Sequence, residues 1–332
     1  MLIDSYSRKH DYLRVSITDR CNLRCGYCMP PEGVELLRHD QVLRNEEFVR
    51  LIGIFVTLGV VKVRFTGGEP LLRKGFIDIV SETRERHPGL ELCLTTNGTL
   101  LHDFIDDLRR LNVKKLNISL DSLSRETYRA ITARDCFDEV IANIDRALWH
   151  RFFDLKINAV MTRETIPELD GFLEYFKERD VTLRFIEKMP FTPETATVSY
   201  LSSDRLIEEL RARGEMLRNT RSDTNVAVMF DYKYQGKYPM RIGVIPPMSD
   251  KFCSSCNRLR ITSEGFLKTC LHSSDDHDLK MLIRNGADDE AIRNSVRNAV
   301  SMKQECHSLD CWPEEGGCAA LARSGSMSKI GG

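Results

Sequence analysis

Residues 12–28 read YLRVSITDRCNLRCGYC, and this stretch joins a strand to a loop that carries three cysteines. The segment Tyr12–Thr18 alternates in polarity and is rich in β-branched side chains, which predicts a strand. The following loop places Cys21, Cys25 and Cys28 within eight residues. Thiolates at this spacing can bind one compact inorganic centre, and in a four-iron cluster they would leave one iron open. Zinc would usually take a fourth protein ligand, and no nearby His or Cys supplies it.

Strands and helices alternate after this loop. Further strands are predicted at 60–66, 91–96, 115–120, 155–161 and 182–187, and helices at about 45–58, 74–86, 101–111, 137–150, 167–179 and 202–213. Such alternation gives parallel strands joined by right-handed crossovers. Six strands are fewer than the eight of a complete barrel. We therefore predict an α/β fold built as a partial (β/α)6 TIM-like barrel, with a closed barrel or a doubly wound sheet as alternatives.

The pattern changes after about Gly214. Two strand pairs are predicted, 226–231 with 240–245 and 258–262 with 266–269, followed by helices near 277–284 and 288–303. We expect residues 1–214 to form the barrel domain with the first cysteine triplet. We expect residues 215–332 to form a smaller α+β domain that carries a second triplet, closes the barrel mouth and ends in Gly331 and Gly332.

The composition limits the classes of function. The 332 residues carry a net charge of −1, which argues against nucleic acid or an anionic membrane surface as a partner. The sequence contains no apolar run long enough to span a bilayer, and its first residues lack the layout of a signal peptide. Eleven cysteines without a signal peptide favour metal binding over disulfides. We expect a cytoplasmic protein.

A second cysteine set lies near the C-terminus. Cys253 and Cys256 form a C-x₂-C pair, and Cys270 follows after thirteen intervening residues. The three cysteines would lie across the predicted hairpin. Taken alone, this set is as compatible with a zinc ribbon, completed by His272 or a tail cysteine, as with an iron–sulfur cluster.

The first loop, C-x₃-C-x-aromatic-C after a strand, resembles that of the radical S-adenosylmethionine (SAM) enzymes. The phrase GGEP at 67–70, which closes the next strand, supports this resemblance. It implies a [4Fe–4S] cluster on the first triplet, whose open iron chelates SAM. One electron then cleaves the sulfonium, and the 5′-deoxyadenosyl radical abstracts a hydrogen atom. The SAM-binding residues implied are Tyr27, Gly67, Gly68, Glu69, Ser119 and Met189.

A more specific resemblance comes from the phrase C-x₂-C-N-R-x-R at 253–260 with Cys270. Together with 13–21, 64–73 and the terminal Gly-Gly, it is similar to the GTP 3′,8-cyclase family, which acts first in molybdenum cofactor biosynthesis. The resemblance covers about residues 8–275 and the last few residues. It implies a second [4Fe–4S] cluster on Cys253, Cys256 and Cys270 that binds the guanine of GTP. It also implies that Gly331 and Gly332 reach the active site and take part in catalysis.

Basic residues gain a role from this resemblance. Lys62 and Arg64 are two apart on one predicted strand and therefore share a face, as do Arg258 and Arg260. Guanidinium groups pair bidentately with phosphate oxygens, so these residues could bind a triphosphate. The alternative is that they form ordinary salt bridges with neighbouring carboxylates. No G-x₄-G-K-[ST] loop is present, so GTP is expected as a substrate. The GTP-binding residues implied are Arg14, Lys62, Arg64, Thr95, Lys156, Arg258, Leu259 and Arg260.

The implied activity is that of a radical SAM lyase that converts GTP to (8S)-3′,8-cyclo-7,8-dihydroguanosine 5′-triphosphate. The implied partners are an electron donor such as flavodoxin or ferredoxin, a downstream cyclic pyranopterin monophosphate synthase, and a second copy of the chain. The alternatives are a radical SAM peptide-modifying enzyme with an auxiliary cluster, and a non-catalytic zinc or iron–sulfur protein. Cys306, Cys311 and Cys318 form an additional triplet that departs from the family pattern. They could ligate a third metal, form a labile pair, or be incidental thiols.

Overall fold

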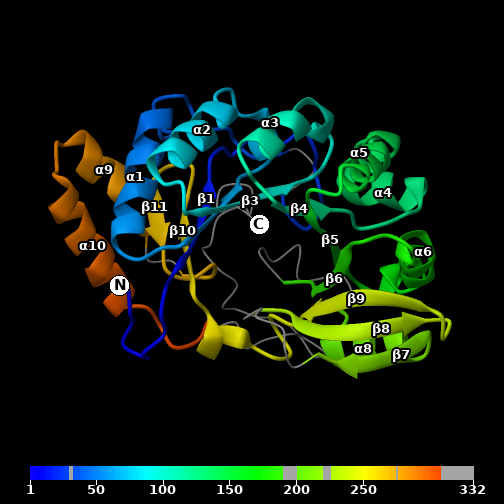
Figure 1. Cartoon of the computed structure of the whole chain (residues 1–332). Helices are drawn as coiled ribbons and strands as arrows, with labels where there is room; N and C mark the ends of the chain where they lie inside the picture. Colours follow the sequence, from blue (N-terminus) through cyan, green and yellow to red (C-terminus); the bar gives the residue numbers. More distant parts are fainter. Residues whose placement is uncertain (30–32, 190–199, 220–225, 274–275, 308–332) are drawn as a thin grey trace.

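The computed structural model describes residues 1–29, 33–189, 200–219, 226–273 and 276–307. The strands within these ranges form one sheet in the order β12-β11-β10-β1-β2-β3-β4-β5-β6-β9-β8-β7. The strands β1 to β6 follow one another in sequence order and pair in parallel, and Figure 1 shows them curving around an open centre. Their bounds are β1 Tyr12–Ser16, β2 Lys62–Thr66, β3 Glu91–Thr96, β4 Lys115–Ser119, β5 Asp154–Met161 and β6 Thr182–Glu187.

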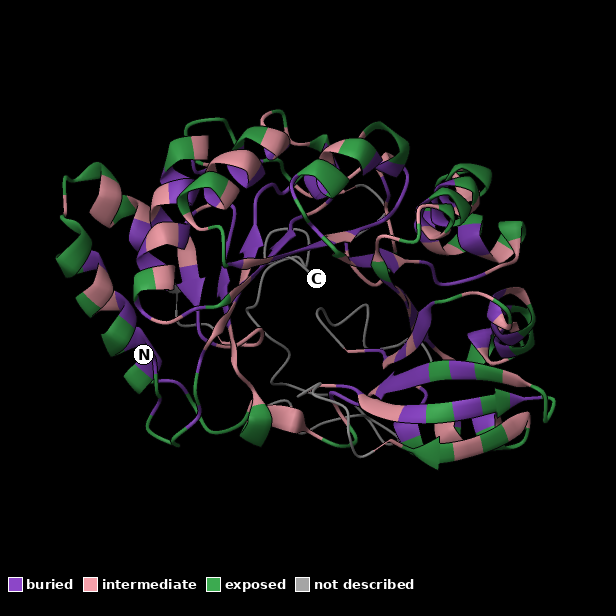
Figure 2. Ribbon diagram, in the orientation of Figure 1, coloured by how far each residue is buried: buried purple, intermediate pink, exposed green. Residues whose placement is uncertain are grey.

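Helices cover the outer face of this curved sheet (Figure 1). They are α1 Asn45–Thr57, α2 Phe76–Arg86, α3 Ile105–Arg110, α4 Arg125–Thr132, α5 Phe137–Trp149 and α6 Glu168–Phe176. Apart from α4, each turns apolar side chains inward. In α1, for example, Phe48, Leu51 and Phe55 recur at helical spacing and are buried. Figure 2 shows the same pattern in the other helices, with buried residues toward the strands and exposed residues outside.

The C-terminal region extends the sheet at both of its edges. β10 (Arg258–Ile261) pairs in parallel with β1, and β9 (Tyr238–Ile245) pairs in parallel with β6. Antiparallel strands then complete each edge. They are β7 Gly214–Arg218 and β8 Val228–Tyr234 beyond β9, and β11 Phe266–Lys268 and β12 Asp276–Asp278 beyond β10. Among the described strands β7 and β12 remain separate edges, so the sheet is open.

Three further helices lie in the described part of this half: α8 Ser203–Arg211, α9 Leu279–Arg284 and α10 Asp289–Ser301. The N-terminal segment lies beside α10 (Figure 1), where the Ser5 hydroxyl donates to the carbonyl of Ser301 at 2.5 Å. The two ends of the described chain therefore meet at one edge of the sheet. No helix within the described ranges is long and apolar enough to cross a membrane.

The predicted α/β class and the open, six-unit core are confirmed. The sequence did not predict α4, β7 and β12. Only Tyr128 and Thr132 of α4 are buried, and β7 has no alternation because most of its side chains are exposed. β12 is three residues long and forms only by pairing with β11.

Candidate active site

A cavity of about 470 Å³ lies inside the curve of the sheet. Strands β1 to β6 contribute side chains to one wall, and residues between Val226 and His307 contribute to the other. All three cysteines of the second triplet line this cavity, and Tyr27 of the first cysteine loop lines it as well. The cavity therefore contains the second cysteine site and reaches the loop of the first at Tyr27, whereas Cys21, Cys25 and Cys28 do not line it.

The register of the sheet brings three arginines side by side on the cavity wall. Arg14 of β1 lies opposite Arg260 of β10 on one side and opposite Arg64 of β2 on the other. Neighbouring residues in register project from the same face, so three positive charges stand in a row. The described lining holds nine Lys and Arg side chains against two carboxylates, Asp121 and Glu187. The basic residues are Arg14, Lys62, Arg64, Lys115, Lys156, Arg184, Lys188, Arg258 and Arg260.

Burial and mutual repulsion lower the pKa of several side chains in this basic wall. Burial lowers the pKa of Arg14 to about 10, and the charges of Arg258 and Arg64 add to the effect. Burial likewise lowers the pKa of Arg184 to about 10, with Arg64 contributing. Like charges held out of water in a cleft are typical of a binding site for an oppositely charged ligand. The wall is suited to a polyanion.

Some of the basic residues already have partners. Lys62 pairs with Glu91 at 2.9 Å, and Lys156 pairs with Asp154 at 2.7 Å, as the salt-bridge alternative supposed. Arg64 donates through Nε to the Tyr12 hydroxyl at 2.8 Å and through Nη1 to the Leu94 carbonyl at 2.6 Å.

Arg184, on β6, was not among the residues predicted from the sequence. Its buried Nε has no hydrogen-bond partner within the described part of the chain. Its register partner on β5 is Asn158, which also lines the cavity. The predicted strand 182–187 beside 155–161 could have revealed this residue, since alternation alone assigns it a face.

The first cysteine loop is held by α4. The backbone N–H of Arg24 donates to the Thr132 carbonyl at 2.8 Å, and that of Gly26 donates to the Ile131 carbonyl at 3.2 Å. Closer to the sulfurs, the N–H of Leu23 donates to Cys21 Sγ at 3.4 Å. A helix that the sequence did not predict therefore positions the loop that the sequence identified first.

The chemistry of this loop fits a cluster. Burial, with smaller contributions from Cys21 and Asp121, raises the pKa of Cys28 to about 12. Burial also raises the pKa of Cys25 well above its usual range. Thiolates in such surroundings need a positive centre to compensate them. No three His, Cys, Asp or Glu side chains within the described ranges are close enough to hold a single ion. A four-iron cluster suits wider spacing, because each thiolate binds a different iron.

The GGEP turn packs directly against the start of this loop. A Cβ on Gly68 would lie 2.3 Å from the Arg20 carbonyl oxygen, and one on Gly67 would lie 2.6 Å from that of Thr18. The glycines therefore permit close approach of this turn to the backbone of residues 18–20. Glu69 is fully buried and accepts from the Thr96 hydroxyl at 2.8 Å and the Asn97 N–H at 2.6 Å. Burial raises its pKa to about 7.

The other residues predicted for SAM and GTP are distributed as follows. Tyr27 donates to Asp121 Oδ2 at 2.7 Å, and Asp121 also accepts from the Val160 N–H at 2.8 Å. Ser119, Met189 and Thr95 line the cavity. The Leu259 side chain is fully buried in the core between Arg258 and Arg260 on β10, and it does not line the cavity. Gly331, Gly332, Cys311 and Cys318 lie outside the described residues.

The second triplet has a different electrostatic setting. Cys253 lies in a 3₁₀ turn, Phe252–Ser255, and Cys256 follows it with its N–H donating to the Cys253 carbonyl at 3.1 Å. Burial opposes ionisation of Cys256, but the positive charges of Arg258 and Lys303 outweigh it and lower the pKa to about 7. A cysteine that ionises this readily beside an open cavity suits metal ligation.

The matches to known proteins agree with this geometry. Residues 15–176 match the Radical SAM superfamily, and residues 181–309 match the family described as Molybdenum Cofactor Synthesis C. The fold is similar to that of Streptococcus suis SuiB bound to S-adenosylmethionine, with a TM-score of 0.62 and 14% identity over 87% of this chain and 68% of that one. An identity this low supports the fold alone. Fold, cysteine loop and superfamily match together define a radical SAM protein.

Two curated relatives make the assignment more specific. The chain is 39% identical over 311 residues to the GTP 3′,8-cyclase of Clostridium botulinum strain Okra, covering 93% of this chain and 95% of the relative. It is also 39% identical over 332 residues to the GTP 3′,8-cyclase of Geobacter sulfurreducens, covering 100% and 99%. The chain belongs to the GTP 3′,8-cyclase family.

Proposed function

We propose that the chain is a radical SAM lyase that converts GTP to (8S)-3′,8-cyclo-7,8-dihydroguanosine 5′-triphosphate, the first step of molybdenum cofactor biosynthesis. The observation that carries this proposal is the row Arg260–Arg14–Arg64 in a cavity that also contains the second cysteine triplet. A nucleoside triphosphate would supply a polyanion for this row and a base for the part of the cavity lined by the cysteines.

The first triplet would hold a [4Fe–4S] cluster, with SAM beside it. Bound there, the pair supplies a 5′-deoxyadenosyl radical for hydrogen abstraction at C3′ of the ribose. Tyr27, Ser119 and Met189 border the cavity and would contact SAM, and the Tyr27–Asp121 hydrogen bond would fix the orientation of the tyrosine. Gly67, Gly68 and Glu69 do not line the cavity. They would support the SAM site by packing against the start of the cysteine loop.

The basic wall would hold the triphosphate. Arg14, Arg64 and Arg260 form its centre, and Lys62, Lys156 and Arg258 extend it. Thr95 lies beside Arg64 at 3.4 Å between its hydroxyl and Nη1. Leu259 can offer only its backbone, since its side chain is in the core. Cys253, Cys256 and Cys270 would hold a second [4Fe–4S] cluster that orients the guanine.

The remaining parts of the proposal come from the family resemblance. The chain would divide near residue 214 into two domains, residues 1–214 and 215–332, and Gly331 and Gly332 would enter the cavity. A flavodoxin or ferredoxin would donate electrons, and a cyclic pyranopterin monophosphate synthase would act next. The protein would be a homodimer with a cytoplasmic location. The absence of a membrane-spanning helix in the described ranges is compatible with that location.

The decisive assay is anaerobic incubation of the reconstituted chain with SAM, a reductant and GTP, followed by mass analysis of the nucleotide. We expect about eight irons per chain and a cyclised, GTP-derived product. If SAM is cleaved only with a peptide substrate, the peptide-modifying alternative is correct. If the chain binds zinc and leaves SAM intact, it is not a radical SAM enzyme.

A further inference from the structure

The second cysteine triplet has a buried lysine behind it. Lys303 follows α10 and is only 4% exposed. Its ammonium donates to Cys256 Sγ at 3.8 Å, to the Arg258 carbonyl at 3.2 Å and to the Thr269 carbonyl. These partners flank two of the three cysteines, since Thr269 precedes Cys270. A single side chain thus links both strands of the hairpin to a sulfur atom.

The charge of Lys303 has no carboxylate partner within the described residues. A buried ammonium is costly unless an anion compensates for its lost hydration. Besides the two carbonyls, the ionisable groups around it are the thiols of Cys256 and Cys270 and the cations Arg8 and Arg258. The thiolates of the second triplet would therefore be the negative charges that compensate this lysine.

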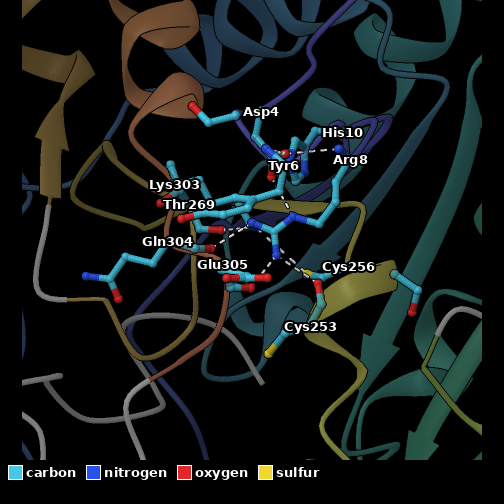
Figure 3. A network of polar contacts seen from close by, with 12 residues as sticks. Asp4, Tyr6, Arg8, His10, Cys253, Cys256, Thr269, Lys303, Gln304 and Glu305 are labelled. Atoms are coloured by element: carbon cyan, nitrogen blue, oxygen red, sulfur yellow. Dashed lines mark hydrogen bonds and ion pairs between the residues drawn. The ribbon is translucent and has the colours of Figure 1, made fainter.

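A network from the N-terminus holds the same segment in place (Figure 3). Arg8 donates to the Cys253 carbonyl at 2.8 Å, to the Glu305 carbonyl at 2.6 Å and to the Gln304 carbonyl at 2.7 Å. Asp4, buried with Arg8, pairs with its Nε at 2.6 Å. Arg8 therefore ties the segment that follows Lys303 to the Cys253–Cys256 turn. This link does not depend on the hydrogen bonds that Lys303 itself makes.

We propose that Lys303 is a positioning residue for the second cluster: it holds Cys256 against the hairpin, and its positive charge raises the reduction potential of that cluster. Hydrogen bonds and charges near the sulfurs set the potential of an iron–sulfur centre, and a positive charge favours the reduced, more negative state. The inference rests on the proposed cluster at this triplet.

The test uses a background in which Cys21, Cys25 and Cys28 are replaced by alanine, so that only the second cluster remains. Lys303→Gln keeps hydrogen-bond donors without the charge, and Lys303→Met removes both. Lys280→Met is the control, because Lys280 also bonds a carbonyl, that of Gln41 at 2.6 Å, and the net charge changes equally. Iron content, the midpoint potential from an EPR-monitored titration, and apo-chain melting are measured.

We expect Lys303→Gln to keep about four irons and to lower the equilibrium constant for reduction about tenfold, which is 59 mV for a one-electron couple. Loss of iron from a folded apo chain in both Lys303 variants would also support the proposal, as a defect in ligand placement. An unchanged potential with iron retained overturns it, as does an apo chain that no longer folds in both variants. If the background itself binds no iron, the second cluster is refuted instead.

Discussion

The two cysteine triplets occupy opposite electrostatic settings. Around the first, carboxylates and burial prevail, and the pKa of Cys28 rises to about 12. Around the second, Arg258 and Lys303 overcome burial, and the pKa of Cys256 falls to about 7. Their supports differ as well: backbone contacts with α4 and the GGEP turn hold the first, whereas long cationic side chains hold the second.

This difference matches the ligands that the two sites are proposed to bind. SAM carries a sulfonium and an ammonium group, so neighbouring carboxylates such as Asp121 suit it. GTP carries a triphosphate, so the row of arginines suits it. One sheet supplies both settings because different strands line different parts of the cavity.

The largest effect is expected from removing one thiol in either triplet. Cys25→Ala and Cys256→Ala should each reduce the iron content from about eight to about four per chain and abolish product formation. Cys136→Ala is the control, because this half-buried cysteine packs against the core and belongs to neither triplet. Iron analysis and the cyclisation assay measure the outcome. Full iron content in Cys256→Ala would remove the second site from the comparison.

A methyl group in the GGEP turn should disturb the first site next most strongly. Gly68→Ala places a Cβ 2.3 Å from the Arg20 carbonyl, so the backbone must shift at a cost of about 3 kcal/mol in the free energy of unfolding. Gly26→Ala, in the cysteine loop, meets nothing within 4 Å and is the matched control. Urea unfolding compares the two. Equal stability of both variants would show that the turn does not constrain the loop.

Removing one charge from the arginine row should weaken the nucleotide site. We expect Arg14→Met to raise the Kd for GTP by about 10- to 100-fold, because a charged hydrogen bond to phosphate is lost. Arg110→Met removes an exposed arginine that pairs with Asp107 and should leave the Kd unchanged. Anaerobic calorimetry provides the measurement. A Kd for SAM that changes as much as that for GTP would contradict the separation of the two settings.

The smallest expected effect concerns the network behind the second triplet. Burial raises the pKa of Asp4, but hydrogen bonds from His10 and Arg8 outweigh it and lower the pKa to about 2 from 3.8. The unfolded chain therefore binds the proton first as the pH falls, so the stabilisation is complete above pH about 4 and is lost toward pH 2. Asp4→Asn should be less stable than the wild type by about 2 kcal/mol or less at pH 6, and the gap should close at low pH. A gap that is independent of pH would exclude the carboxylate as its source.

Sequence alternation predicted β1 to β6 to within about two residues, because apolar and polar side chains largely alternate along these strands. It also placed Lys62 with Arg64, and Arg258 with Arg260, on shared faces, and these four side chains do line one cavity. It could not reveal α4, whose sequence buries only two side chains. Lys303 was beyond reach as well, since its sulfur contact joins residues 47 apart in sequence through tertiary packing.

The most direct test of the account separates the two triplets by their nucleotide affinity. One variant replaces Cys21, Cys25 and Cys28 by alanine, and the other replaces Cys253, Cys256 and Cys270; the Kd for GTP is measured anaerobically for both. We predict that the first variant binds GTP as the wild type does, whereas the second binds it at least about tenfold more weakly, or 1.4 kcal/mol. Equal affinity in the two variants, or a loss confined to the first, would contradict the assignment of GTP to the second site.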